Sequence, residues 1–431
     1  MLLIYTPKNS ERCQYILELI FKHELGIEYR VVTDYEQFNV HHEEKINYSN
    51  SRLPDSFFIN ASSLLFEKNI HQQNIIVTRK GQTKILFANE DCDLGFDIFS
   101  SVFYMVSRYE EYLPFTPDSH GRFKASDSLA FKHNFLQQPV VNIWINLLKN
   151  NLQQRFPSLK IKPSLFHAVV TYDIDVAYKF KGRDTFRTLG STTKDILKLK
   201  FKNIYQRFAT LLNFQKDPWD VYNYLRETAL IAKLKPIFFF LVADKSTNDR
   251  NLDYKNPHVK SLIKNVMEFS EIGIHPSYTT SEFPEKIAKE KERLEQISGK
   301  EITKSRQHYL KFILPHTYRS LIAAGITEDY SMGFSEIAGF RAGTCKPFYF
   351  YDLKEEKITH LKIFPIAMME GSFMKNKKSP EQSSQEILNL INEVKKVQGT
   401  FISIWHNHTV SETSEYKKWK RIHDKMIQTI Q

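Results

Sequence analysis

Apolar and polar positions along residues 161–431 fall into alternating blocks that predict strands and helices in turn. Short runs of β-branched and aromatic residues without helical spacing predict buried strands, and they lie at 166–170, 236–242, 272–275, 339–341, 361–366 and 401–405. Apolar residues at every third or fourth position predict helices at 219–232, 259–269, 283–297, 316–324 and 380–397. This alternation predicts an α/β fold with a parallel sheet or barrel and a functional site at the strand ends.

Residues 1–160 have a less regular pattern. It predicts strands at 1–6, 75–77 and 84–87 and helices at 15–21, 104–112 and 141–153. The polar segment 157–160 precedes the next buried strand and predicts a boundary there. We therefore expect a smaller mixed α/β domain at 1–160, without a catalytic constellation, followed by a main domain at 161–431.

Composition narrows the class of protein. The 431 residues are 42% hydrophobic and include 33 Phe and 21 Tyr, enough for a large core. The net charge of +11 favours an anionic partner, but no motif of a nucleic-acid-binding fold accompanies it, so we expect no nucleic acid. No apolar run approaches the roughly 20 residues that cross a bilayer, and residues 1–7 lack the basic region of a signal peptide. Three cysteines without a CxxC pair argue against a disulfide framework or a cysteine-rich zinc site and favour the reducing cytoplasm.

Residues 179–202 carry eight Lys or Arg against two Asp, with apolar residues interleaved among the charges. This pattern is typical of a basic amphipathic helix or hairpin, and it predicts a basic helical insertion at about 179–215. The insertion either contacts an anionic membrane or a polyanion at its periphery, or is a solvated helical segment that packs on the protein itself.

The strand at 166–170 leads into two carboxylates, Asp173 and Asp175, separated by one residue. At the carboxyl end of a strand they lie where α/β folds build their sites. Carboxylates this close repel each other unless a cation or a shared proton relieves the repulsion. The alternative is a pair of loop acids that cap the following helix.

Further polar residues occur at or near other strand ends in the same half of the chain. They are His275, which precedes a proline, His308 in a polar segment after a helix, Arg341 before a flexible turn, and His406 and His408 after the last strand. Each of these positions means little alone. Together with the paired acids they predict one site.

These residue types suffice for metal-assisted hydrolysis. Asp175, His275 and a second histidine can hold a divalent ion with an open position, and the nitrogen ligands favour Zn²⁺. Such an ion lowers the pKa of a bound water towards about 7 and polarises the carbonyl group under attack. Asp173 would accept the proton from that water, Arg341 would pair with Asp173 and keep it ionised, and His406 would protonate the leaving amine or alcohol.

Residues 165–431 resemble the polysaccharide deacetylase family, also called the NodB-homology or carbohydrate esterase family 4 domain. The resemblance rests on Thr171-Tyr172-Asp173-Ile174-Asp175, the Phe-rich strand 236–241, His275-Pro276-Ser277, Arg341 with Pro347-Phe348, and Trp405-His406. It implies a distorted, incomplete (β/α) barrel that removes an N-acetyl group from a sugar, or hydrolyses a related amide or ester. It also implies that Asp173 is the catalytic base and Asp175 a metal ligand, although one residue separates the two acids here.

One position departs from the family pattern. The second motif normally supplies another metal-binding histidine four residues after the first, but this position is Thr279. We expect His308 to replace it as a metal ligand, with His408 as the other candidate. Tyr278, Trp405 and His408 are the candidate substrate-binding residues.

Three functional hypotheses follow. The first is a zinc-dependent, cytoplasmic deacetylase whose partner is a carbohydrate substrate. The second is a catalytically degenerate sugar-binding or scaffold protein, which the missing histidine at Thr279 favours. The third takes Asp173 and Asp175 as the Asp-x-Asp site of a nucleotide-sugar glycosyltransferase, an interpretation that leaves His275 and His406 without roles. Residues 1–160 are similar to an uncharacterised domain that precedes deacetylase-like domains in some bacterial proteins, which implies no activity; the sugar and the oligomeric state stay open.

Overall fold

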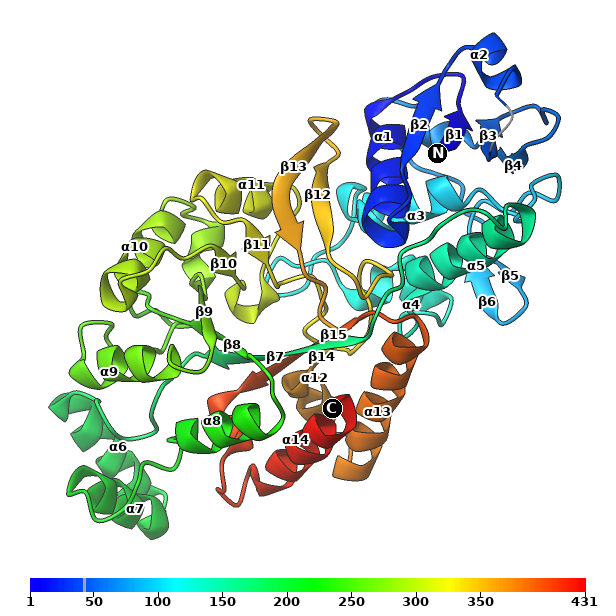
Figure 1. Cartoon of the computed structure of the whole chain (residues 1–431). Helices are drawn as coiled ribbons and strands as arrows, with labels where there is room; N and C mark the ends of the chain where they lie inside the picture. The colour runs from blue at the N-terminus through cyan, green and yellow to red at the C-terminus, as the bar shows by residue number, and fades with distance from the viewer. Residues whose placement is uncertain (42–43) are drawn as a thin grey trace.

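The computed structural model describes residues 1–41 and 44–431 (Figure 1). The described strands form a four-stranded sheet near the N-terminus, a nine-stranded sheet in the second part of the chain, and a two-stranded hairpin. The two larger sheets do not share hydrogen bonds between strands. The sheet that carries the candidate residues is therefore built by the chain after residue 166.

The N-terminal sheet is parallel throughout, with the strand order β2-β1-β3-β4. Its strands are β1 (Leu2–Tyr5), β2 (Tyr29–Val32), β3 (Lys45–Ser49) and β4 (Phe57–Asn60), and the hairpin consists of β5 (Thr78–Lys80) and β6 (Thr83–Ile85). The α-helices of this part are α1 (Glu11–Leu17), which continues as the π-helical η1 (Glu18–Leu25), α2 (Tyr35–Asn39), α3 (Ile98–Val106), α4 (Leu129–Lys132) and α5 (Val140–Arg155). The strand predicted at 1–6 and the helix predicted at 141–153 are confirmed as β1 and α5.

The nine-stranded sheet has the order β12-β13-β11-β10-β9-β8-β7-β15-β14. All neighbours in it are parallel except β12 and β13, which form an antiparallel pair. The strands are β7 (His167–Ile174), β8 (Ile237–Phe240), β9 (Glu271–Ile274), β10 (Lys304–Ser305), β11 (Glu328–Asp329), β12 (Phe348–Asp352), β13 (Lys357–Ile363), β14 (Met368–Met369) and β15 (Thr400–His406).

Helices alternate with these strands as the apolar spacing predicts. They are α8 (Tyr222–Ile231), α9 (Pro257–Val266), α10 (Lys286–Ser298), α11 (His316–Ala323), α12 (Glu370–Lys375), α13 (Pro380–Lys396) and α14 (Lys417–Ile430). The starts of two helices follow from local chemistry. Asn256 caps α9 and Ser379 caps α13 through side-chain hydrogen bonds, and each is followed by a proline in the first turn.

Both faces of the sheet are apolar. On β8, Phe238 and Phe240 belong to the large core that includes apolar residues of the helices, whereas Ile237 and Phe239 belong to a second cluster with Ile404 of β15. Alternate side chains of a strand point to opposite faces, so β8 must be apolar along its whole length. This explains the uninterrupted Phe-rich run in the sequence.

The α/β class and the parallel arrangement agree with the prediction. The sheet is open, because β12 and β14 form its two edges, and the distorted, incomplete (β/α) barrel stays a prediction. The strand predicted at 339–341 was wrong. The N–H of Gly339 bonds to the carbonyl of Ala367 and that of Phe340 to the carbonyl of Leu136, outside any strand pairing. Gly339 has a φ of +145°, a conformation that favours glycine and does not continue a strand.

Residues 1–160 pack firmly against the rest of the chain. Arg341 donates to the buried carboxylate of Glu111 at 2.8 Å, and the Tyr15 hydroxyl donates to the carbonyl of Tyr349 at 2.7 Å. One apolar cluster contains residues of both parts. A boundary near residue 160 stays a prediction, because the core is continuous across it.

The basic insertion predicted at 179–215 forms two helices between β7 and α8, α6 (Thr185–Leu197) and α7 (Phe201–Leu211). Figure 1 shows them at the end of the molecule away from the N-terminal sheet. In the described parts of the chain, no helix is both long enough and apolar enough to cross a membrane.

Candidate active site

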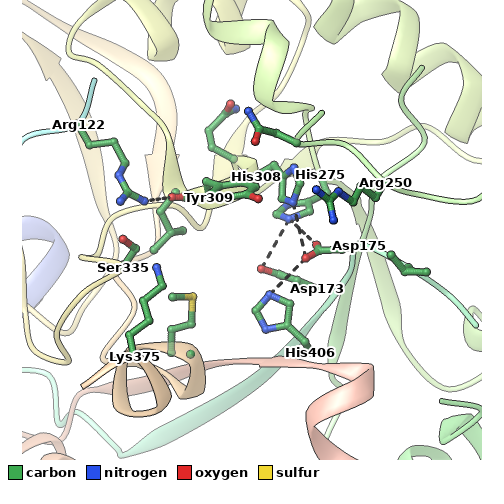
Figure 2. A pocket seen from close by; sticks show the side chains of 16 residues that line it. Arg122, Asp173, Asp175, Arg250, His275, His308, Tyr309, Ser335, Lys375 and His406 are labelled. Atoms are coloured by element: carbon green, nitrogen blue, oxygen red, sulfur yellow. Dashed lines mark hydrogen bonds and ion pairs between the residues drawn. The ribbon is translucent and has the colours of Figure 1, made fainter. Parts of the chain in front are cut away.

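The candidate residues converge because neighbouring parallel strands end at one edge of the nine-stranded sheet. His406 on β15 is the register partner of Asp173 on β7, and Ser305 on β10 is the partner of Ile274 on β9. Residues that follow these strands are therefore brought together although they are far apart in the sequence (Figure 2).

Asp175 lies at the centre of the group. Its Oδ1 is 3.3 Å from Nε2 of His275, and its Oδ2 is 3.6 Å from Nε2 of His308 and 3.6 Å from Nε2 of His406. Figure 2 shows the three imidazole rings turned towards this carboxylate. His275 and His308 are almost fully buried, whereas Asp175 keeps 26% of its side chain exposed to the cavity. The site is thus enclosed by the sheet but open on one side.

The Nδ1 atom of each of these histidines lies within hydrogen-bond distance of an oxygen acceptor on the side of the ring away from Asp175. The acceptors are the carbonyl of Arg306 for His275 (2.5 Å), Oδ1 of Asp249 for His308 (2.8 Å) and Oε1 of Glu370 for His406 (2.6 Å). An acceptor at Nδ1 holds a hydrogen there, so in the neutral ring Nε2 is left as a free lone pair. This arrangement fixes the ring orientation and is the usual support of a metal-binding histidine.

A metal ion fits Asp175, His275 and His308. Their ligand atoms all lie within 4.8 Å of one another. Within the described residues, Oδ1 of Asp175 is buried without a hydrogen bond, and it faces the lone pair of His275 Nε2. Two acceptors that face each other are stabilised by a cation between them. One carboxylate and two imidazoles suit a catalytic zinc site, which keeps one position open.

Asp173 is held by Arg306 rather than by the predicted arginine. Nη1 of Arg306 donates to Oδ1 of Asp173 at 2.9 Å and to the hydroxyl of Thr171 at 2.5 Å, and its Nε donates to the carbonyl of Tyr330 at 3.0 Å. Arg306 is fully buried. The second oxygen of Asp173 points towards His275, with Oδ2 and Nε2 3.9 Å apart. Asp173 therefore presents one free, fixed carboxylate oxygen to the site.

The prediction that Arg341 pairs with Asp173 was wrong. Arg341 donates to Glu111, from the N-terminal part, and to the carbonyl of Gly333 at 3.0 Å. Its guanidinium stacks over the rings of Phe312 and Phe334. A buried guanidinium needs a carboxylate partner, and here the N-terminal part of the chain supplies it.

Electrostatics in the site favour positive charge. Burial alone lowers the pKa of His308, but the carboxylates of Asp175 and Asp249 outweigh it and raise this pKa to about 9. Burial likewise lowers the pKa of His406, but Glu370 and Asp175 raise it to about 10. Burial raises the pKa of Asp175, but His308 and His406 outweigh burial and lower this pKa well below its usual range. The same carboxylates that attract protons to the rings attract a cation.

The remaining predicted residues are placed differently. His308 is in the metal-ligand group and His408 is not, because the ring of His408 packs between Trp219 and Tyr416. The indole of Trp405 is fully buried in the core, so the prediction that it binds substrate was wrong. Tyr278 packs behind Tyr309, with ring centroids 5.3 Å apart, and of the two only Tyr309 lines the cavity; the substrate role of Tyr278 stays a prediction.

The site opens into a cavity of about 300 Å³. Its lining includes the paired acids, the three histidines and the aromatic ring of Tyr309, which is 38% exposed. Three cationic side chains, Arg122, Arg250 and Lys375, also line it (Figure 2). Arg122 comes from the N-terminal part of the chain and donates to the carbonyl of Tyr309. This part therefore contributes to the cavity wall, which its sequence pattern did not predict.

Three residues that support the site were not predicted. Arg306, Asp249 and Glu370 are fully buried polar side chains that hold Asp173, His308 and His406. Of the three, only Arg306 could have been suspected from the sequence, because it lies two positions before the candidate ligand His308. Asp249 and Glu370 lie in segments without any pattern that sets them apart from surface acids.

The N-terminal part of the chain matches a known family model. Residues 2–157 match a family described as a family of unknown function, DUF7033. No curated protein matches the chain. A solved candidate polysaccharide deacetylase from Mycobacterium smegmatis is similar, with a TM-score of 0.40 and 11% identity over 62% of this chain and 85% of that one.

Two further structures show a weaker likeness. The polysaccharide deacetylase of Bacillus cereus has a TM-score of 0.33 and 9% identity over 62% of this chain and 87% of its own. A CE4 family pseudoenzyme from Bacillus anthracis has a TM-score of 0.32 and 10% identity over 62% of each chain. Because these TM-scores and identities are low, the function has to be argued from the site itself.

Proposed function

We propose that the protein is a metal-dependent hydrolase that removes acetyl groups from an acetylated carbohydrate. The observation that supports it most is the arrangement around Asp175, where three imidazole Nε2 atoms face one carboxylate and each ring has an acceptor behind it. Beside this group lie a buried carboxylate with a free oxygen, Asp173, and a histidine, His406, directly opposite it in the sheet register. Together they provide a base, an acid and a cation site.

In the proposed reaction, water adds to the carbonyl carbon of the acetyl group, and the bond between this carbon and the sugar nitrogen or oxygen breaks. A divalent ion, which we expect to be zinc, would supply Lewis acidity when held by Asp175, His275 and His308. Asp173 accepts the proton from the water through its free oxygen. His406 gives a proton from Nε2 to the departing amine or alcohol, while Glu370 keeps its ring in place.

Carbohydrate as the substrate class rests on the resemblance of the motifs and on the shape of the site. The exposed ring of Tyr309 at the cavity wall suits stacking against a sugar ring. Against the degenerate-scaffold hypothesis stands the group of Asp175, His275 and His308, whose ligand atoms lie within 4.8 Å of one another although residue 279 is a threonine. The glycosyltransferase hypothesis gives no role to the three oriented histidines.

The first test is the zinc content of the purified full chain, measured by elemental analysis for the wild type, His308→Ala and His408→Ala. We expect one zinc per wild-type chain, loss of zinc in His308→Ala and retention in His408→Ala. Acetate release from N-acetylated chitooligosaccharides and O-acetylated xylooligosaccharides then tests turnover and bond type.

Asp173→Asn separates metal binding from catalysis. It should retain zinc but lose acetate release by roughly 10²-fold or more, as expected for a general base. A wild-type chain that binds no metal even after zinc is supplied would contradict the proposal. Full activity of Asp173→Asn would contradict the assigned base.

A further inference from the structure

The α6–α7 hairpin, residues 179–216, is firmly attached to the fold. The carboxylate of Asp217 accepts three backbone N–H groups at the base of the hairpin, those of Lys179, Phe180 and Lys181, at 2.7 to 3.0 Å. Arg207 of α7 is buried and donates to Asp195 of α6 at 2.5 Å, which ties the two helices together. The hairpin is thus a defined element with one side packed and the other free.

The free side is strongly apolar. None of the residues of α6 is buried. Large apolar side chains with most of their surface exposed are Phe186 (87%), Phe214 (82%), Leu197 (80%), Leu199 (74%), Tyr205 (72%) and Phe201 (63%). On α7 the exposed residues at 201, 205 and 208, with Leu212 directly after the helix, follow helical spacing and form one face. Several large exposed apolar side chains on one element are typical of a binding surface.

The same hairpin is basic. Residues 179–216 contain ten Lys or Arg, and their only acids are Asp184 and Asp195. In the described structure Lys198, Lys200 and Lys202 form no ion pair, and they alternate with Leu199 and Phe201. The cationic groups therefore surround the exposed apolar side chains rather than cover a separate face.

We propose that the α6–α7 hairpin docks the protein on a membrane surface that contains anionic lipids. Apolar side chains that enter the interface and lysines that meet lipid headgroups are the two requirements of such an element, and this hairpin provides both. A second copy of the chain is a poor occupant, because two hairpins of the same high charge would repel each other.

The base of the hairpin is also close to the candidate site along the chain. The hairpin begins four residues after Asp175, and Val176 between them lines the cavity. A carbohydrate carried by a membrane lipid is then the substrate class that this placement favours, a consequence that rests on the proposed function. Membrane binding itself does not require catalysis, so the two proposals fail independently.

Co-sedimentation of the full chain with vesicles tests the docking. We expect binding to vesicles of phosphatidylcholine that contain phosphatidylglycerol as the minor lipid, and at least tenfold weaker binding to vesicles of pure phosphatidylcholine. Both measurements use salt near the physiological concentration, since screening weakens the contribution of the lysines. Lys198→Glu/Lys200→Glu and Leu197→Ser/Phe201→Ser should each weaken binding to the anionic vesicles by at least tenfold, without a change in thermal unfolding.

Matched controls lie on other elements. Lys354→Glu/Lys357→Glu makes the same charge change in the β12–β13 turn and at the first residue of β13, and Ile76→Ser replaces an apolar residue that is 66% exposed in the N-terminal part. Both should bind like the wild type. Equal binding of wild type and hairpin variants, absence of binding to anionic vesicles, or a dimer that the hairpin substitutions dissociate would overturn the proposal.

Discussion

The role of each histidine in this protein depends on what lies behind its ring. His275, His308 and His406 each have an acceptor on Nδ1 and turn Nε2 towards Asp175. His423 is equally buried but bonds both nitrogens to tyrosine hydroxyls, at 2.9 and 2.8 Å. Burial lowers its pKa to about 3, and the lone pair of its neutral ring accepts a hydrogen bond from a tyrosine hydroxyl. In the described structure, the three rings around Asp175 differ from His423 because no hydroxyl group bonds to their Nε2 atoms.

Asp249 should control metal affinity without binding the metal. Asp249→Ala removes the acceptor behind His308, so the ring loses its fixed orientation. We expect zinc affinity to fall by about 10- to 100-fold, the usual effect of losing such a support. Competition titration with a zinc chelator measures it. Asp244→Ala, at a carboxylate that is 77% exposed, is the matched control and should not change affinity; an equal loss in both variants would contradict the role of Asp249.

The buried arginines Arg306 and Arg341 should behave differently when each is changed to lysine. Arg306→Lys keeps a positive charge but cannot hold Asp173, Thr171 and the Tyr330 carbonyl at once, since the fork geometry is lost. We expect kcat to fall by about 10-fold or more with zinc retained, because the base loses its orientation. Arg341→Lys should instead lower the melting temperature and leave kcat within about twofold. The assignment of Arg306 fails if both variants lose activity alike.

At the scale of elements, the sequence predicts those strands and helices that are long enough for their apolar spacing to repeat. The strands β7, β8 and β15 and the helices α9, α11 and α13 lie close to their predicted positions, because each repeats its apolar spacing over several residues. The strands β10, β11 and β14 have two residues each, too few for any period to show. Arg306 directly follows β10, so the sequence did not show that it lies at a strand end. The sequence therefore predicted Arg341 instead of Arg306 as the partner of Asp173.

The turn after β9 depends on α10 and should carry a pH signature. Glu290 of α10 is buried and accepts the N–H and hydroxyl of Ser277 at 2.9 and 2.6 Å. Burial raises its pKa to about 7, despite these hydrogen bonds. Between the ordinary pKa of a glutamate and about 7, the folded chain therefore binds more protons than the unfolded chain. The free energy of unfolding must fall as pH rises through this window.

Glu290→Gln removes that titration. Relative to the wild type, its free energy of unfolding should rise between pH 4.5 and pH 8 by up to about 3 kcal/mol, the linkage value of such a shift. Urea unfolding at both pH values measures the difference. Glu292→Gln, at an exposed position of the same helix, should follow the wild type at both pH values. A pH-independent difference for Glu290→Gln would show that its pKa is not raised.

At the scale of the whole molecule, the two parts of the chain depend on each other. Residues 1–160 give Glu111 to a buried arginine of the main part and give Arg122 to the cavity wall. The apolar patterns within each part predict the helices and strands of that part. They do not indicate which buried charged residue of one part pairs with a residue of the other. The association could therefore be seen only in the structure.

Glu111 should consequently be critical for stability although it lies outside the site. Its carboxylate holds both Arg341 and Arg108, at 2.8 and 2.7 Å from their Nε atoms. Glu111→Ala leaves two buried guanidinium groups without this partner, and loss of a buried charge partner costs about 3 to 5 kcal/mol. Glu393→Ala, which breaks an exposed pair with Lys396, should cost less than about 1 kcal/mol. Urea unfolding of both variants measures the difference, and equal small losses would mean that Glu111 does not hold the two parts of the chain together.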